Sequence, residues 1–349
     1  MKGIAFALLA ALLFGASTPL AKKLLPQVEP VLMAGLLYLG SGIGLGAFWL
    51  WRSRDKAVGS KEASLNRREL PWLAGAILAG GLIGPVLLMV GLSATPASSA
   101  SLLLNLEGVL TALLAWFLFK ENFDFRIALG VALIATGGIV LSWSGRPAIG
   151  IPWGPLAIVG ACLAWAVDNN LTRKVSAGDP VQVALIKGLV AGGVNTALGV
   201  ILGARLPALP TLLATGVIGL FGYGVSLTLF VLALRHVGAA RTGAYFSTAP
   251  FVGAVISILL LGDKLTVEFG AAAALMGAGV WLHLTERHEH LHRHEPMEHE
   301  HLHYHDEHHQ HTHGPNDPPG EPHSHWHRHE ELVHSHPHYP DIHHRHSHQ

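Results

Sequence analysis

The sequence predicts an all-α membrane protein, with ten transmembrane helices in two inverted five-helix repeats followed by a disordered tail. Hydrophobic residues make up 50% of the chain and charged residues only 13%, whereas about a quarter of a soluble protein is charged. Between Gly3 and Leu284, apolar runs of about 20 residues recur, each long enough to cross the hydrocarbon layer as a helix. Alternation with a period of two residues is absent from these runs, so helices are the expected spanning elements.

Ten apolar segments are long enough to span a membrane. They cover residues 3–21, 31–50, 71–91, 97–118, 125–143, 152–171, 181–203, 211–233, 239–261 and 266–284. The longest polar loop, between the second and third segments, contains Arg52, Arg54, Lys56, Lys61, Arg67 and Arg68. Loops rich in lysine and arginine stay in the cytoplasm, so this loop and both termini are predicted to be cytoplasmic. We expect a multi-pass protein in the lipid bilayer of the cell (inner) membrane.

The two halves of the chain resemble each other weakly. Residues 96–137 can be placed on residues 238–279 without a gap, and a second alignment pairs Phe14 with Trp165. Each unit contains five spans, an odd number, so the second copy must be inverted relative to the first. Inverted repeats are typical of secondary transporters, whose substrate site lies near the middle of the membrane between the repeats.

Composition divides the chain into three parts. We expect a first five-helix repeat at residues 1–145, a second at 150–285, and a histidine-rich tail at 286–349. The formal net charge of zero therefore averages unlike segments, and most of the 25 histidines lie in the tail. Cys162 is the only cysteine, which excludes an intrachain disulfide.

Several short motifs recur at matching places in the two halves. They are Phe14–Gly15 and Trp165–Ala166, Glu29–Pro30 and Asp179–Pro180, and Pro250 with Gly262–Asp263–Lys264. Over about residues 3–284 this pattern resembles the EamA-type transporters of the drug/metabolite transporter superfamily. The resemblance implies export of small metabolites or drugs. In one departure, Gly108 after Glu107 stands where the second half has Pro250, so an acid is expected to replace the usual proline break in helix four.

Glu107 lies near the middle of the fourth span. A lone carboxylate in the hydrocarbon region is costly, so such residues are functional candidates by default. Glu107 could exchange a proton or bind a cationic substrate. The structural alternative is a protonated side chain that hydrogen-bonds a neighbouring helix.

A second polar group is expected where the sixth span ends and the seventh begins. Asp168 could form an ion pair with Lys187, which would neutralise both charges in low dielectric. Asn169 and Asn195 could line the same cavity. The alternative is that Lys187 extends its ammonium to the headgroups while the acidic and amide residues cap a helix.

Aromatic residues could form the walls of a solute site. Tyr223 and Tyr245 are the candidates, together with Trp165 and Phe14. Tyrosine and tryptophan also gather at membrane surfaces, which is the alternative reading.

The tail after Leu284 alternates histidine with polar and acidic residues, a composition that cannot build a core. Imidazole suits Zn, Ni and Co, and a flexible chain could wrap several rings around one ion. The candidate ligands are His288, His290, His292, His294, His299, His301, His303, His305, His308, His309, His311 and His313. A pH-responsive segment and low-complexity drift are the alternatives.

Three functions fit these observations. The first is a secondary transporter, an exporter of a small metabolite or drug-like solute by alternating access, with a metal-binding cytoplasmic tail. The second is a divalent metal (Zn/Ni/Co) efflux transporter with the tail as ion collector. The third is a membrane-tethered metal buffer or sensor. Motifs for ATP binding or hydrolysis are absent from the sequence, so we expect no enzyme, no required cofactor and no nucleic-acid partner, while a homodimer stays open.

Overall fold

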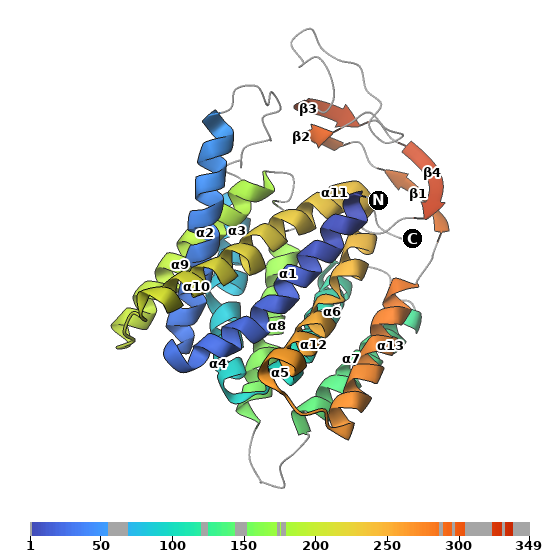
Figure 1. The fold of residues 1–349 in the computed structure, drawn as a ribbon. Helices are drawn as coiled ribbons and strands as arrows, with labels where there is room; N and C mark the ends of the chain where they lie inside the picture. Colours follow the sequence, from blue (N-terminus) through green and yellow to red (C-terminus); the bar gives the residue numbers. More distant parts are fainter. Residues whose placement is uncertain are drawn as a thin grey trace.

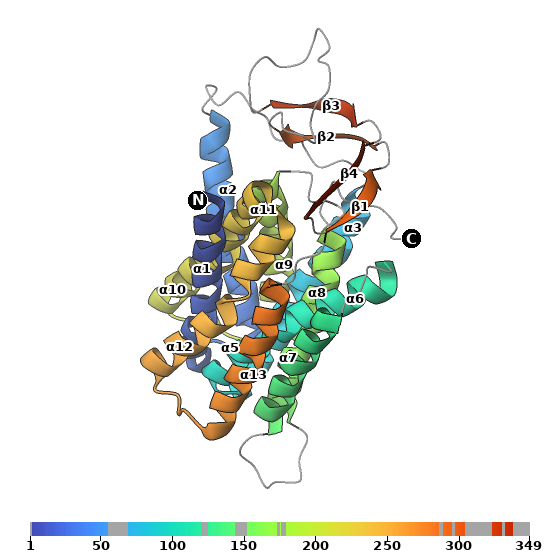
Figure 2. The ribbon, with the colours of Figure 1, turned by 90° about the vertical axis from the view of Figure 1, so that its right-hand side faces the viewer.

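The computed structural model shows a bundle of helices with short strands beyond one end (Figures 1 and 2). The N-terminus lies at the same end as the strands (Figure 1). The structure describes residues 2–54, 69–119, 125–143, 152–172, 175, 179–285, 289–294, 297–303, 323–329 and 332–337. Most of the predicted basic loop lies outside these residues.

Proline marks several helix starts in the first half. Its fixed φ and missing N–H suit the first helical turn, and α2 accordingly begins at Pro30, directly after Glu29. The elements are α1 (Lys2–Leu24), the 3₁₀ turn η1 (Leu25–Gln27), α2 (Pro30–Arg54), α3 (Leu70–Ala76), the π-helical η3 (Ile77–Ile83), α4 (Gly84–Ala94), α5 (Ala97–Leu103), α6 (Leu106–Phe119) and α7 (Phe125–Trp143).

Side-chain caps add to the boundaries in the second half. The Asp179 carboxylate accepts a hydrogen bond from the N–H of Val181 at the start of α9 (2.9 Å), and the Thr266 hydroxyl accepts one from the N–H of Phe269. The elements are α8 (Trp153–Thr172), α9 (Pro180–Ile201), α10 (Leu209–Gly219), the π-helical η4 (Leu220–Val225), α11 (Ser226–Phe246), α12 (Ala249–Leu261) and α13 (Val267–Leu284).

The helices pair across the two halves of the sequence. α2 packs against α9, α7 against α13, α1 against α11 and α12, and α8 against α4 and α6; α7 and α13 lie side by side in both views (Figures 1 and 2). Between α2 and α9 the backbones touch, since a Cβ added to Gly42 would come within 2.6 Å of the Leu189 nitrogen. Small residues permit such approaches in membrane proteins.

Two helix boundaries differ from the prediction. The fourth span, predicted to be continuous, is interrupted at Leu104–Asn105. The first half therefore keeps a break without proline, and the expectation that Glu107 had replaced it was wrong. The Asn105 amide donates to the carbonyl of Leu102 (3.0 Å), a local bond that competes with regular helix.

The second difference concerns the eighth and ninth spans. The predicted loop between them, residues 234–238, is part of α11, and the break comes at Ser247–Thr248. Polar residues suggested a loop there, but a helix satisfies its own backbone hydrogen bonds whatever its side chains are.

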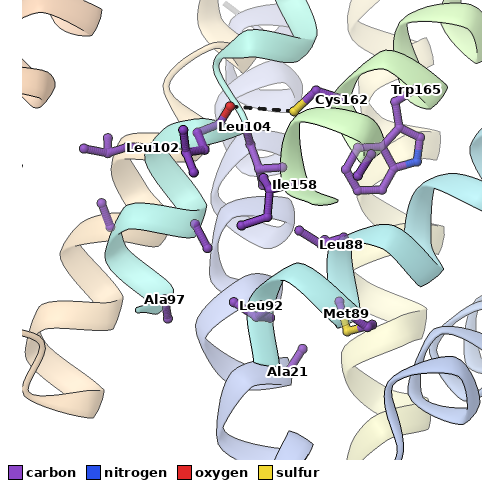
Figure 3. Close-up of a cluster of buried hydrophobic side chains, with 14 of the residues drawn as sticks. Ala21, Leu88, Met89, Leu92, Ala97, Leu102, Leu104, Ile158, Cys162 and Trp165 are labelled. Carbon is purple, nitrogen blue, oxygen red and sulfur yellow. Dashed lines mark hydrogen bonds between the residues drawn. The ribbon is translucent and has the colours of Figure 1, made fainter. Parts of the chain in front are cut away.

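The hydrophobic core joins both halves and lies around the α4, α5 and α8 contacts. It includes Leu88, Leu92, Leu102 and Ile158, all fully buried (Figure 3). The thiol of Cys162 lies there too, near the carbonyl of Leu103 at 3.6 Å. Large apolar side chains are also exposed on the outside, as lipid-facing surfaces require: Leu12, Ile43, Val194, Leu259 and Val267.

Five helical stretches of the described chain are long and apolar enough to cross a membrane. They are Lys2–Gln27, Pro30–Trp51, Leu70–Ala94, Pro180–Ile201 and Leu209–Ala233. Shorter apolar helices occur at Ala128–Ser142, Ala249–Leu261 and Val267–Leu282. A multi-pass helical membrane protein is thus confirmed, while the count of ten crossings and the inversion of the repeats stay predictions.

Parts of the tail form strands, in contrast to the expected disorder. β1 (Glu289–His294) pairs with β4 (Leu332–Pro337), and β2 (Met297–His303) with β3 (His323–His329), both antiparallel. The period-two alternation of histidine suits an extended chain, which explains the pairing without a hydrophobic core. Disorder of the rest of the tail stays a prediction.

Candidate functional site

The predicted ion pair between Asp168 and Lys187 is present and buried. The Lys187 ammonium donates to Asp168 Oδ1 at 2.6 Å and to Oδ2 at 2.7 Å. The Thr172 hydroxyl donates to Oδ1 at 2.8 Å. Gly80 makes room for this carboxylate, because a side chain there would collide with Asp168. The pair is neutral overall, as a low-dielectric interior demands.

The π-helical segment η3 supplies carbonyl groups to side chains of other helices. The Gly80 carbonyl accepts from the Tyr38 hydroxyl (2.8 Å) and from the Trp165 indole (2.9 Å). The Asn195 amide donates to the carbonyl of Gly81 (3.1 Å). π-helical turns expose such groups and are frequent at functional sites. Asn195 therefore binds the backbone of η3. The sequence had predicted a different role for it, as a residue that lines a cavity.

Glu107 and Asn169 lie together at the contact of α6 and α8. The Asn169 amide donates to Glu107 Oε1 at 2.8 Å and lies 3.4 Å from the Thr111 hydroxyl. Glu107 is partly exposed, and Asn169 and the neighbouring Gly108 are exposed. We call Glu107, Asp168, Asn169 and Lys187 the charged layer. One of its carboxylates is thus partly exposed and bonded to a neutral amide, and a role for it in proton exchange or ion binding stays a prediction.

An aromatic cluster surrounds Phe14. The Phe14 ring centroid lies 6.3 Å from that of Trp165, 6.0 Å from that of Tyr223 and 5.5 Å from that of Phe246. These distances are typical of edge-to-face and tilted contacts. Phe14, Trp165 and Tyr223 therefore lie together, while their role as walls of a solute site stays a prediction. Tyr245 is half-buried, and its carbonyl accepts the Thr248 hydroxyl at the helix break.

A small packing gap, with no room for a water molecule, lies between α1, α5 and α12. Its lining residues are Phe14, Gly15, Thr18, Ser101, Leu104, Ala249 and Pro250. The Ser101 hydroxyl is buried and has no hydrogen-bond partner among the described residues. Residues from both halves therefore meet at this gap, next to the aromatic cluster.

At the other end of the bundle, charged side chains hold the turn between α4 and α5. The Lys22 ammonium donates to the carbonyls of Leu92 (2.5 Å), Ser93 (3.2 Å) and Thr95 (3.0 Å). The Asp263 carboxylate accepts from the N–H of Ser98 at 2.8 Å. A cation at the C-terminal end of α4 and an anion at the N-terminal end of α5 both complement the helix dipoles. We call Lys22, Asp263 and this turn the latch.

Sequence reasoning missed several of these residues. Tyr38, Phe246 and Ser101 looked like ordinary residues of apolar spans, and only packing brings them to the site. Lys22 did carry a signal, because it is one of a pair of cations at the end of the first span.

Metal ligands are the least defined part of the prediction. His288, His305, His308, His309, His311 and His313 lie outside the described residues. The described residues contain no group of three or more His, Cys, Asp or Glu that could hold a metal ion.

Comparison with known proteins identifies the family. A relative from Methanothermobacter thermautotrophicus, known as an uncharacterized transporter, is 28% identical over 78% of this chain and 83% of its own length. The uncharacterized inner membrane transporter YedA of Escherichia coli K12 is 29% identical over 73% and 82%. A crystal structure shares the fold with a TM-score of 0.60 and 20% identity, covering 80% of this chain and 95% of the other. The model of the EamA-like transporter family matches residues 1–143 and 152–285, so this chain belongs to that family of membrane transporters.

Proposed function

We propose that the protein is a secondary transporter that exports a small metabolite or drug-like solute by alternating access. The observation that carries this proposal is the contrast between the latch, at one end of the helix bundle, and the charged layer. Around the latch, the residues Ala97, Ser98, Ala100 and Ser101 of α5 are buried. In the charged layer, Glu107 stays partly exposed and Asn169 is exposed. A bundle that is closed on one side and accessible on the other is what one state of an alternating-access cycle requires.

Matched irregularities in the two halves support the repeat on which such a cycle depends. η3 begins at Ile77 and η4 at Leu220, 143 residues apart. The helix breaks at Leu104–Asn105 and Ser247–Thr248 are separated by the same 143 residues. The α1 contacts with α11 and α12 also correspond to the α8 contacts with α4 and α6. Two inverted five-helix units that rock against each other would use these breaks as hinges.

The predicted orientation gives the cycle a direction. With both termini in the cytoplasm, the latch lies outside and the charged layer opens inward. Substrate would then enter from the cytoplasm, and opening of the latch would release it. Glu107 would couple transport to protons, because an accessible intramembrane carboxylate can bind either a proton or a substrate group.

Transport by purified protein in sealed vesicles tests this function. We expect uptake of some members of a labelled panel of neutral, anionic and cationic metabolites, driven by a proton gradient. Glu107→Gln should abolish the proton-driven component, and the matched control Glu268→Gln, at the exposed start of α13, should leave it intact. Uptake in Glu107→Gln equal to the unchanged protein would contradict proton coupling. A panel in which nothing moves would contradict the function.

A second function, metal binding by the tail, is favoured by the strand register. β2 and β3 place His299 opposite His327, His301 opposite His325 and His303 opposite His323. This register brings the backbones of three pairs of histidines together. Imidazole is a ligand that suits Zn, Ni or Co. The tail could bind such ions as a regulator of solute export, as a collector for metal efflux, or as an independent buffer.

Deleting residues 288–349 separates these roles. We expect calorimetry with Zn²⁺, Ni²⁺ and Co²⁺ to show binding that disappears with the tail, while vesicle uptake of organic solutes persists. Loss of metal flux alone in the truncated protein would support metal efflux. Unchanged metal binding after truncation would contradict a metal-binding tail.

A further inference from the structure

The π-helical segments η3 and η4 occupy matching places in the two halves of the chain. η3 packs against α8 and α9, and η4 packs against α1 and α2, which precede it in the same order. A Cβ added to Gly81 of η3 would lie 2.7 Å from the Ala191 methyl of α9. One added to Gly224 of η4 would lie 2.9 Å from the Ser41 hydroxyl of α2. Ser41 and Ala191 correspond when α2 and α9 are aligned at their first prolines, so equivalent residues meet at the two segments.

Side chains from three helices bind η3. The Tyr38 hydroxyl of α2 and the Trp165 indole of α8 donate to the Gly80 carbonyl at 2.8 and 2.9 Å. The Asn195 amide of α9 donates to the Gly81 carbonyl at 3.1 Å. All three donors are buried, and a buried polar group that loses its partner is costly. η3 is therefore fixed to α2, α8 and α9.

An ion pair joins two of these helices beside η3. Lys187 of α9 donates to both carboxylate oxygens of Asp168 on α8, at 2.6 and 2.7 Å. The carboxylate lies directly against Gly80, where an added side chain would collide with it. Separating such a pair would leave two unpaired charges in low dielectric. We call the side chains that hold η3 the clasp: Tyr38, Trp165, Asp168, Lys187 and Asn195.

The positions around η4 that correspond to the clasp are small or apolar. Aligned with Asp168, Lys187 and Asn195 are, in that order, Ser17, Leu37 and Leu45. Leu45 packs over Gly224, whose added Cβ would lie 3.3 Å from the leucine side chain. Within the described part of the chain, the side chains of α2 form no hydrogen bond with η4, and the rings of Tyr38 and Tyr223 meet with their centroids 5.3 Å apart. The contact between α2 and η4 is therefore made by packing.

η4 is tied to α1 instead. The Ser226 hydroxyl, directly after η4, donates to the Ala10 carbonyl of α1 at 2.9 Å, and Tyr223 of η4 interacts with the Ser17 hydroxyl of α1. α1 also packs along α11, which continues η4. η4, α11 and α1 thus form one unit that meets α2 through apolar side chains and close backbones. Apolar contacts are non-directional, so packed helices can slide past each other over short distances.

Resting on the proposed transport function, we propose that the two π-helical segments have different roles in the transport cycle. The clasp holds η3 on α2, α8 and α9 in every state. η4 moves with α1 and α11 and slides along α2, and this movement opens and closes the bundle. Movement between the repeats is thus concentrated where η4 meets α2, because the clasp ties the repeats together at η3.

A matched pair of disulfides tests the proposal in a Cys162→Ala background, which removes the native thiol. Ser41→Cys with Gly224→Cys joins α2 to η4, and the equivalent pair Ala191→Cys with Gly81→Cys joins α9 to η3. The close approach at both glycines brings each pair within reach of a disulfide. We expect oxidation of the first pair to abolish vesicle uptake of the labelled metabolite panel until a reductant is added. Oxidation of the second pair should leave uptake unchanged.

A single substitution tests the same contact without a cross-link. Leu45→Asn would place an amide over the Gly224 carbonyl, as Asn195 lies over Gly81. One added hydrogen bond should slow uptake by about threefold to tenfold. Leu45→Met, which nearly keeps the volume, is the control and should not slow it. Equal uptake in these two variants would overturn the proposal, as would uptake that persists with the first disulfide or stops equally with the second.

Hydrogen exchange of the unchanged full-length protein in detergent tests the clasp independently of transport. Backbone amides of Leu220–Val225 should exchange at least about tenfold faster than those of Ile77–Ile83, after correction for intrinsic rates, because fewer bonds must break for local opening. Asn195→Leu should speed exchange in η3 alone. Equal rates, or slower exchange in η4, would contradict the difference between the segments. Faster exchange in η4 in a protein that moves no metabolite would keep the clasp and contradict transport.

Discussion

The latch and the charged layer both use charged side chains, but in opposite ways. In the latch, Lys22 and Asp263 bond main-chain groups at helix ends, and the surrounding α5 residues are buried. In the charged layer, Asp168 and Lys187 bond each other, while Glu107 stays partly exposed. Charges directed at helix ends close and fix a structure, whereas an incompletely paired acid is free to change its partner. The comparison therefore divides the bundle into a closed end and a reactive centre.

The largest effect on this comparison is expected from Asp168→Asn. It leaves the Lys187 ammonium buried without a counter-charge, which should reduce the free energy of unfolding by about 3–5 kcal/mol. Thermal unfolding of the purified protein measures the loss. The double exchange Asp168→Lys with Lys187→Asp should restore part of it, and no restoration would show that the pair is not the stabilising interaction.

Next in size is a matched pair of glycine substitutions. Gly15→Ala should reduce the free energy of unfolding by about 1–3 kcal/mol, because the new methyl would press into the Ala249 backbone. Gly108→Ala should be neutral or stabilising by up to about 1 kcal/mol, since its methyl meets open space. Equal melting temperatures for the two variants would contradict the difference in packing.

A smaller effect on stability, with a clear effect on access, is expected from Lys22→Met. The loss of a charge-assisted bond to the α4 carbonyls should reduce stability by about 1–2 kcal/mol and loosen the latch. The measurement is labelling of Ser98→Cys by a membrane-impermeant maleimide after Cys162→Ala removes the native thiol. Labelling should become faster with Lys22→Met, and the matched Lys23→Met variant serves as control. An unchanged rate would show that the latch does not close this end.

The smallest effect is expected from Asn169→Ala. This exposed side chain contributes little to stability, but its amide holds the Glu107 carboxylate by a hydrogen bond. Proton-driven uptake in vesicles should fall by about threefold to tenfold, a change of roughly 1 kcal/mol. The neighbouring Asn170→Ala is the control, because the Asn170 amide bonds only its own helix at the Ala166 carbonyl among the described contacts. A larger fall in uptake with Asn170→Ala would show that Asn169 has no special role beside Glu107.

Sequence reasoning predicted the membrane class, the helical fold and the family. The length of an apolar segment and the lysine and arginine content of a loop can be read locally, and the bilayer constrains both directly. It also predicted the Asp168–Lys187 pair, since two opposite charges in apolar spans have few alternatives. Two predictions were wrong. The fourth span was expected to be continuous because it lacks the proline, yet it breaks at Leu104–Asn105. A loop was expected before Ala239 because of its polar residues, yet the helix continues there.

Only the tertiary structure decided how these residues meet. Tyr38 and Trp165 converge on Gly80 because η3 widens to a π-helix and frees its carbonyl. The latch joins Lys22 to a turn 70 residues away, and no local pattern predicts such a distance. Composition and periodicity thus determined that this chain crosses a membrane. The packing of α6 on α8 decided that Glu107 bonds the Asn169 amide and stays partly exposed, because contacts between distant helices depend on shape and not on sequence spacing.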